Sequence, residues 1–130
     1  MYKINKIKEI NKPSYKKLIK YAKYFSIKKI NMSFYNDLLK FYIDDKLIAI
    51  VNYCITPSMI GKDKLFIRNL YCNETIYLNE IVIELCNYCK TKDLIILASI
   101  DNNRDNFTKE CIKSFYDNNF KGKDIIIYTY

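Results

Sequence analysis

The sequence contains no histidine among its 130 residues. A catalytic triad of serine, histidine and an acid needs an imidazole as general base, and a cysteine–histidine nucleophile needs the same group. Histidine-based metal sites depend on it as well. The sequence therefore excludes these three kinds of site.

Glycine and proline are also scarce, with two of each. Neither of the glycine-rich phosphate loops, GxxxxGK[ST] and GxGxxG, occurs in the chain. Such loops need glycine because the backbone must approach the phosphates closely. A nucleotide site of either kind is therefore excluded.

Long apolar runs are missing too. The longest uninterrupted runs are a few residues, whereas a span across a bilayer takes about 20. Residues 1–12 mix lysine and asparagine with single apolar residues, which is not the pattern of a signal peptide. We expect a cytoplasmic protein that does not enter a membrane.

The five cysteines are an odd number without the spacing of a disulfide framework, which indicates reduced thiols. Cys86 and Cys89 form a CxxC pair, but they lie inside a predicted helix, and no second pair follows at zinc spacing. A redox pair usually opens a helix, where the helix dipole lowers the thiol pKa. We expect these cysteines to pack as small apolar groups and expect no metal site.

What is present is apolar and basic. Half of the residues are hydrophobic and 15% are aromatic, which excludes a disordered tail and fits a single domain over residues 1–130. Eleven lysines and only two acidic residues fall within residues 1–40, whereas the rest of the chain is nearly neutral. This basic third could attract an acidic partner or could be a solvated helix face.

Hydrophobic periodicity predicts ten helices and strands along the chain. A weak edge strand over residues 2–10 precedes a helix that starts near Pro13 and has an apolar face of Tyr15, Leu18, Ile19, Ala22 and Phe25. A short helix is predicted around residues 33–39. Strands at 39–43 and 46–55 flank an Asp44-Asp45 turn, and a third strand covers 64–72. A helix over 78–90, a strand over 94–100, a helix containing 107–115 and a strand at 125–128 complete the chain.

The apolar face of the 78–90 helix consists of five residues: Leu78, Ile81, Val82, Leu85 and Cys89.

This order of elements, together with the segment Phe115-Tyr116-Asp117-Asn118-Asn119-Phe120, resembles the GNAT superfamily of acyl-CoA-dependent N-acyltransferases. The segment is similar to the family's F-Y-x-x-x-G-F motif, with Asn119 in place of glycine. Asparagine tolerates the left-handed conformation best after glycine. The resemblance implies an α+β fold, with a mixed, mostly antiparallel twisted sheet flanked by three or four helices.

The resemblance implies transfer of an acetyl or other acyl group from acyl-CoA to an amine by direct attack. It implies that Tyr116 protonates the departing thiolate, since a phenol can act as a general acid. Glu74, just after the third strand, is a candidate base that acts through water. Lys109 stands where the family often has an asparagine. Asn102, Asn103 and Asn106 lie further upstream, and one extra helical turn would reconcile the two patterns.

The family's glycine-rich diphosphate loop aligns without gaps to the segment after Cys72, where Tyr77 takes the R/Q position. Leu78, Glu80 and Val82 take the positions that are usually small, so Leu78 is expected to crowd the backbone and Glu80 to repel the phosphates. The residues implied to bind the cofactor are Leu70, Tyr71, Cys72, Tyr77, Leu78, Asn79, Glu80, Ile81, Val82 and Asn103.

These departures leave a second hypothesis open. The protein would be a GNAT-shaped binding module without catalysis, whose basic N-terminal third contacts an acidic protein or nucleic acid. Only one strand is predicted after the last helix, where the family has two. The other edge is either absent or supplied by a second copy of the chain in a homodimer.

Overall fold

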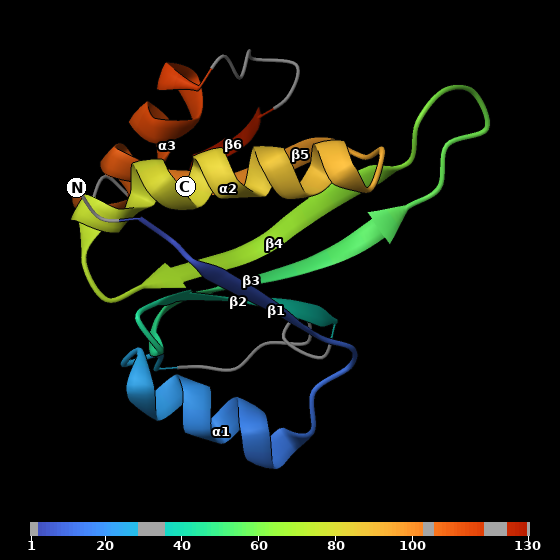
Figure 1. Ribbon diagram of the computed structural model, residues 1–130. Coiled ribbons are helices and arrows are strands. Elements are labelled where there is room, and N and C mark those ends of the chain that lie inside the picture. The colour runs from blue at the N-terminus through green and yellow to red at the C-terminus, as the bar shows by residue number, and fades with distance from the viewer. Residues whose placement is uncertain (1–2, 29–35, 103–105, 119–124, 130) are drawn as a thin grey trace.

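Six strands form one mixed sheet, in the same order in the sheet as in the chain (Figure 1). The computed structural model describes residues 3–28, 36–102, 106–118 and 125–129. The strands are β1 (Lys6–Ile10), β2 (Asp37–Ile43), β3 (Lys46–Thr56), β4 (Lys64–Cys72), β5 (Ile95–Asn102) and β6 (Ile125–Thr129). The helices are α1 (Tyr15–Tyr24), α2 (Leu78–Thr91) and α3 (Asn106–Asp117), with a 3₁₀ turn η2 (Thr75–Tyr77) before α2.

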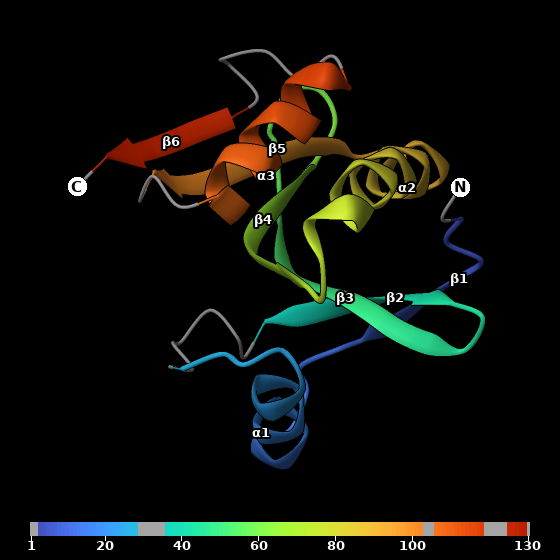
Figure 2. The ribbon, with the colours of Figure 1, turned by 90° about the vertical axis from the view of Figure 1, so that its left-hand side faces the viewer.

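The strands β1 to β4 are antiparallel, whereas β4, β5 and β6 run parallel to one another. Parallel neighbours need crossover connections, and α2 and α3 supply them. Both crossover helices cover one face of the sheet and α1 covers the other (Figures 1 and 2). The predicted fold class, a mixed and mostly antiparallel sheet with flanking helices, is confirmed.

The helix α1 begins where the sequence predicts. Ser14 is its N-cap, and the Ser14 hydroxyl accepts a hydrogen bond from the Lys17 amide at 3.3 Å. Leu18 and Tyr21 are its buried residues and pack against Leu38 and Ile50 of the sheet. The prediction for Tyr15 is wrong, because this side chain is 60% exposed. The buried stripe is centred between Leu18 and Tyr21, and Tyr15 falls beside it.

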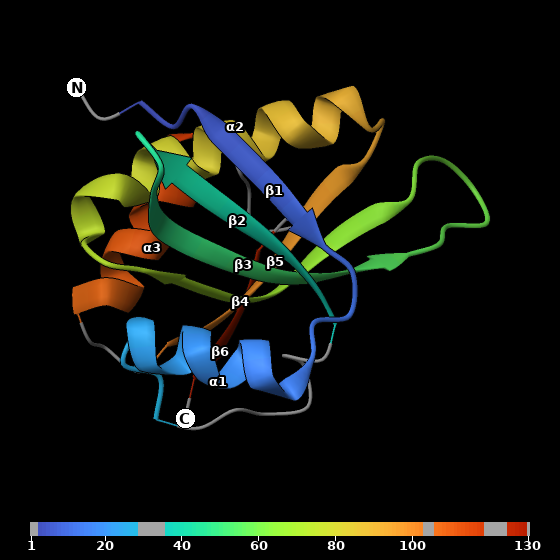
Figure 3. The same cartoon turned by 60° about the horizontal axis from the view of Figure 1, so that its bottom comes forward.

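The β2–β3 hairpin is also confirmed (Figure 3). Asp44 and Asp45 both adopt positive φ values, 47° and 67°, which is the conformation that a two-residue hairpin turn requires. The predicted helix around residues 33–39 is wrong at its end, because Asp37 already belongs to β2. Its earlier part lies outside the described residues.

The predicted edge strand over residues 2–10 is shorter than expected. The strand β1 covers Lys6–Ile10 and lies at the sheet edge beside β2. Tyr2 lies outside the described residues. The strand β6 lies at the opposite edge and pairs with β5. Whether a second copy of the chain extends that edge stays a prediction.

All five residues of the predicted apolar face of α2 are buried, and four of them, all except Leu78, belong to the larger core. Cys89 is one of them, and burial raises the pKa of its thiol to about 12. Cys86, one turn earlier, also has a pKa raised by burial. Both groups are protonated thiols at neutral pH, which fits the predicted packing role.

No helix in the described part of the chain has the length and apolar character needed to cross a membrane.

Candidate functional site

The parallel ladder between β4 and β5 ends halfway along β4. Residues Lys64 to Ile67 pair with Ile95 to Ala98. Beyond Ala98, β5 continues in register with β6, while β4 continues beside β3 to Cys72. Figure 2 shows β4 turning towards β3 where β5 runs on towards β6. The two strands therefore separate, and the edge of β4 from residue 68 onwards faces this opening.

A β-bulge lies at the point of separation. Asn52 of β3 pairs with Asn69, but its neighbour Tyr53 pairs with Ile67, so Arg68 is an extra residue in β4. A bulge bends its strand and turns backbone groups out of the regular ladder. Arg68 directly follows Ile67, the last β4 residue that pairs with β5. The bulge thus directs β4 away from β5 and opens the sheet at this position.

Two asparagines hold the bulge in place. Asn52 is fully buried, and its Oδ1 accepts a hydrogen bond of 2.9 Å from Nδ2 of Asn69, the residue after the bulge. The Asn52 amide donates to the backbone carbonyls of Asp37 at 3.1 Å and Asn36 at 3.4 Å. A buried polar side chain is retained where its hydrogen bonds are satisfied. This network ties the start of β2 to the bulge in β4.

Beyond the bulge, β4 contributes side chains to both faces. Leu70 and Cys72 pack against the larger core under α2, and Tyr71 packs against the smaller cluster under α1. The Cys72 thiol donates to the Glu74 carbonyl at 3.1 Å, and burial raises its pKa to about 12. A neutral thiol is a poor nucleophile. Cys72 therefore does not provide a covalent route at this site at neutral pH.

The opening lies next to the first turn of α2. The 3₁₀ turn η2 leads directly into the helix, and Tyr77 stands at the N-cap position without a capping hydrogen bond from its side chain. The helix N-terminus carries a partial positive charge from its backbone amides. Glu80 is half-buried and is the acidic residue of this first turn.

The amino-acid sequence matches no protein-family model and no curated protein. Solved structures do match. A possible acetyltransferase from Clostridium difficile 630 superposes with a TM-score of 0.57 over 98% of this chain and 97% of that chain, at 16% identity. An aminoglycoside acetyltransferase from an uncultured soil metagenomic sample, in complex with sisomicin, superposes with a TM-score of 0.60 over 96% and 93%, at 10% identity.

The chain has the GNAT fold. The resemblance that the sequence indicates is confirmed at the level of the fold. At these identities the likeness establishes the path of the chain, and the roles of individual residues depend on the site itself.

Within the GNAT fold, three of the implied cofactor residues at the start of α2 point into the core. The side chains of Leu78, Ile81 and Val82 are buried, with Leu78 only 1% exposed. Only their backbone groups could reach a cofactor. The Leu78 side chain is buried, and the expectation that it crowds the backbone approach stays a prediction.

Asn79 connects the two crossover helices. Its Oδ1 accepts a hydrogen bond of 2.8 Å from Nδ2 of Asn118, and that same amide donates to the Ser114 carbonyl at 2.8 Å. The end of α3 therefore lies beside the start of α2. The structure brings together the two segments in which the sequence places Tyr116 and the diphosphate-binding residues.

The two implied catalytic residues lie on different segments, Tyr116 on α3 and Glu74 between β4 and η2. Tyr116 is in the last turn of α3, next to the buried Phe115, and is described by its backbone only. Glu74 is exposed, just after β4, and its carbonyl accepts from Cys72. Asn103 lies outside the described residues. The roles of Tyr116, Glu74 and Asn103 stay predictions.

Coenzyme A fits one part of this site better than the other. The separated edge of β4 presents a backbone to which an extended thioester arm could bind alongside Leu70 to Cys72. At the start of α2, the helix dipole favours a diphosphate but the half-buried Glu80 opposes it. The expected repulsion by Glu80 and the expected crowding by Leu78 both stay predictions.

Sequence reasoning missed the bulge and the asparagine pair. A signal was present, because Asn52 is the single polar residue within the apolar run from Leu47 to Ile55. A buried polar residue in a central strand requires a partner, and it could have pointed to a local irregularity. Nothing in the sequence around Arg68 marks it as the extra residue of a bulge.

Proposed function

We propose that the protein transfers an acyl group, with acetyl as the first candidate, from acyl-CoA to an amine in the cytoplasm. The observation that carries this proposal is the coincidence of the Arg68 bulge with the end of the β4–β5 ladder. A backbone edge turned out of its ladder can bind an extended thioester and polarise its carbonyl.

The reaction is a direct displacement. The lone pair of the amine forms a bond to the thioester carbonyl carbon, and the carbon–sulfur bond then breaks. The amine loses its proton through a water to Glu74, and the departing thiolate takes a proton from Tyr116. The products are an amide and free coenzyme A. Backbone groups of Leu70 to Cys72 orient the arm, and the protonated Cys72 takes no covalent part.

The first test is binding of acetyl-CoA. A ligand that binds only the native state stabilises that state by mass action and so raises the melting temperature. At a ligand concentration one hundred times its Kd, the free energy of unfolding rises by about 2.7 kcal/mol. We expect a shift of several degrees and measurable heat in a calorimetric titration. Neither a shift nor heat at millimolar acetyl-CoA would contradict the acyltransferase proposal.

The second test is Tyr116→Phe. It should leave the fold and acetyl-CoA affinity unchanged and lower turnover at least about tenfold, the lower range for the loss of a general acid. Release of free thiol is measured with simple amines and with sisomicin, the ligand of one structural neighbour. An unchanged rate would make Tyr116 a structural residue.

A binding module on the same fold is the second candidate, and Glu80 favours it. A carboxylate that is half-buried in the first turn of α2 weakens any diphosphate site there. In that case, acetyl-CoA gives neither a melting-temperature shift nor heat in the titration, and the basic third of the chain contacts an acidic protein or nucleic acid.

A further inference from the structure

A groove of about 700 Å³ lies on the α1 side of the molecule. We call it the Lys-Tyr groove. Its lining comes from α1, from β2, from the β2–β3 turn and from the start of β3. The lining residues are Lys20, Tyr21, Lys23, Tyr24, Lys40, Tyr42, Asp45, Lys46 and Leu47.

The charge of the Lys-Tyr groove is strongly unbalanced. Four lysines line it against one carboxylate, Asp45. That carboxylate already forms an ion pair of 3.2 Å with Lys6. No ion pair with a described acidic side chain is formed by any of the four lysines. Four like charges around one hollow repel one another unless an anion lies among them.

Lys40 occupies the wall of the groove between two aromatic rings. Its ammonium lies 5.7 Å from the ring centroid of Tyr21 and 5.6 Å from that of Tyr42. Burial by itself would lower the pKa of Lys40, but hydrogen bonds to the Tyr42 and Tyr21 hydroxyls raise it above its ordinary value. The ammonium therefore keeps its charge at neutral pH and is held in one place.

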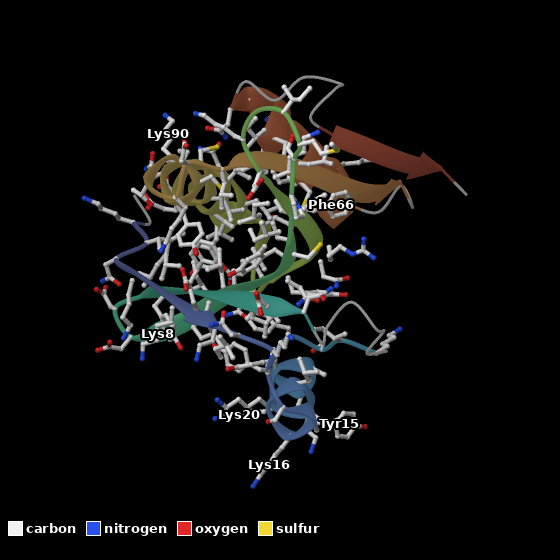
Figure 4. All side chains as sticks on the ribbon, turned by 90° about the vertical axis from the view of Figure 1, so that its right-hand side faces the viewer. Lys8, Tyr15, Lys16, Lys20, Phe66 and Lys90 are labelled. Atoms are coloured by element: carbon white, nitrogen blue, oxygen red, sulfur yellow. The ribbon has the colours of Figure 1, made fainter. Side chains whose placement is uncertain are left out.

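The positive field extends beyond the lining residues. Lys6 and Lys8 of β1 also lie over the Tyr42 ring, at 4.7 and 5.8 Å from its centroid. Figure 4 shows Lys20 leaving α1 on the side on which Lys8 also lies, whereas Lys16 points away from the sheet. One face of α1 thus belongs to the groove and another does not.

The groove also adjoins the loop that leads to α2. The Tyr24 hydroxyl donates to the Leu47 carbonyl at 2.7 Å, and both residues line the groove. Asn73, the first residue after β4, donates to that same carbonyl at 3.2 Å and to the Tyr24 hydroxyl at 3.4 Å. A ligand in the groove would therefore lie next to the segment between β4 and α2.

We propose that the Lys-Tyr groove binds the clustered phosphate groups of a nucleotide-type ligand. Each phosphate monoester brings a charge of about −1.5 to −2 and three acceptor oxygens, so a few phosphates match several lysines within a small volume. Carboxylates bring one charge each and would need more space. A hollow of this size suits a small ligand and not the flat contact of a protein or duplex.

Two sources of such phosphates fit the chemistry. One is a free nucleoside triphosphate. The other is the phosphorylated adenosine end of coenzyme A, in which case the inference rests on the proposed acyl transfer. Tripolyphosphate and ATP test the groove by itself, and coenzyme A compared with 3′-dephospho-coenzyme A identifies the source.

The experiment compares two double variants on the same helix. Lys20→Gln/Lys23→Gln removes two charges from the groove, and Lys16→Gln/Lys17→Gln removes two exposed charges outside it. Both lower the net charge equally, so non-specific attraction changes alike. Calorimetric titration with tripolyphosphate and ATP at low salt should show about tenfold weaker binding for the first variant only.

Four outcomes decide the inference. Selective loss in Lys20→Gln/Lys23→Gln supports it, and so does a loss that is larger for coenzyme A than for its dephospho form. Equal weakening by both double variants would show that binding depends on net charge and not on the groove, and would overturn the inference. Absence of binding to tripolyphosphate and ATP at millimolar concentration would overturn it as well. Failure of acetyl-CoA turnover leaves the tripolyphosphate result intact, so the two proposals fail separately.

Discussion

The two faces of the sheet differ in how they are filled. The face under α2 and α3 carries the larger core, which includes Leu85, Val82 and Phe115. The face under α1 carries a cluster of four buried residues, a buried asparagine and the Lys-Tyr groove. The same strands form both faces, so the difference comes from the helices and from the alternate residues of each strand.

This difference separates stability from binding. A densely packed apolar face contributes most of the hydrophobic stabilisation, which scales with the area removed from water. A face with polar side chains and a hollow contributes less but can accept a ligand. The sheet lies between the two faces. At the bulge at Arg68 the pairing of β4 with β5 ends, and the opening there interrupts the sheet.

The largest expected effect compares one leucine from each face. Leu85→Ala should lower the free energy of unfolding by about 3–5 kcal/mol, because the tightly packed core cannot collapse into the cavity. Leu18→Ala should cost about 2 kcal/mol, because α1 rests on a small cluster and can shift towards the sheet. Urea unfolding measures both. Equal costs would contradict the contrast between the faces.

The next effect concerns the buried polar group under α1. Asn52→Leu keeps the number and branching of the side-chain heavy atoms but removes the hydrogen bonds that Asn52 makes with Asn69 and with the Asp37 carbonyl. We expect a cost of about 1–3 kcal/mol, the penalty for leaving buried polar groups unsatisfied.

The matched control for Asn52→Leu is the double variant Asn52→Leu/Asn69→Leu. It should recover part of the loss, since it removes both side chains of the pair. Full stability of the single variant would show that the network does not hold the bulge.

The smallest effect concerns Glu80 at the start of α2. If coenzyme A binds there, Glu80→Gln should tighten it, and more so at low salt, because like-charge repulsion is least screened there. If the α2 terminus does not bind phosphates, the variant should only lose about 0.3–1 kcal/mol of stability through the helix dipole.

Glu84→Gln, one turn later on the same helix, is the control for Glu80→Gln. It changes the net charge equally but lies away from the first turn. Tightening by both variants alike would indicate an effect of net charge rather than a contact at the α2 terminus.

Local patterns were enough for most elements. The five apolar residues of α2 recur at helical spacing, and all five are buried. Asp44 and Asp45 mark the hairpin turn because few residues other than glycine, asparagine and aspartate accept positive φ. The order of strands and helices then predicted antiparallel strands followed by two crossovers, which is the fold observed.

The errors arose where a residue's partners lie far away in the sequence. Leu38 and Leu39 are adjacent and both fully buried, one under α1 and one in the larger core. A strand that is covered on both faces shows no alternation of apolar and polar residues, so the sequence pattern at its start favours a helix as well. Tyr15 has an apolar ring at helical spacing, but the position of the sheet leaves it exposed.

The sequence by itself determined most helices and strands and their order, since these follow from local spacing. It also determined which chemistry is open to a chain without histidine, since that follows from residue type. Only the tertiary structure decided the bulge at Arg68, the separation of β4 from β5 and the Lys-Tyr groove. Each of these depends on which residues of distant segments become neighbours. Strand register and helix placement are set by the summed packing of the whole sheet, and no local pattern encodes that sum.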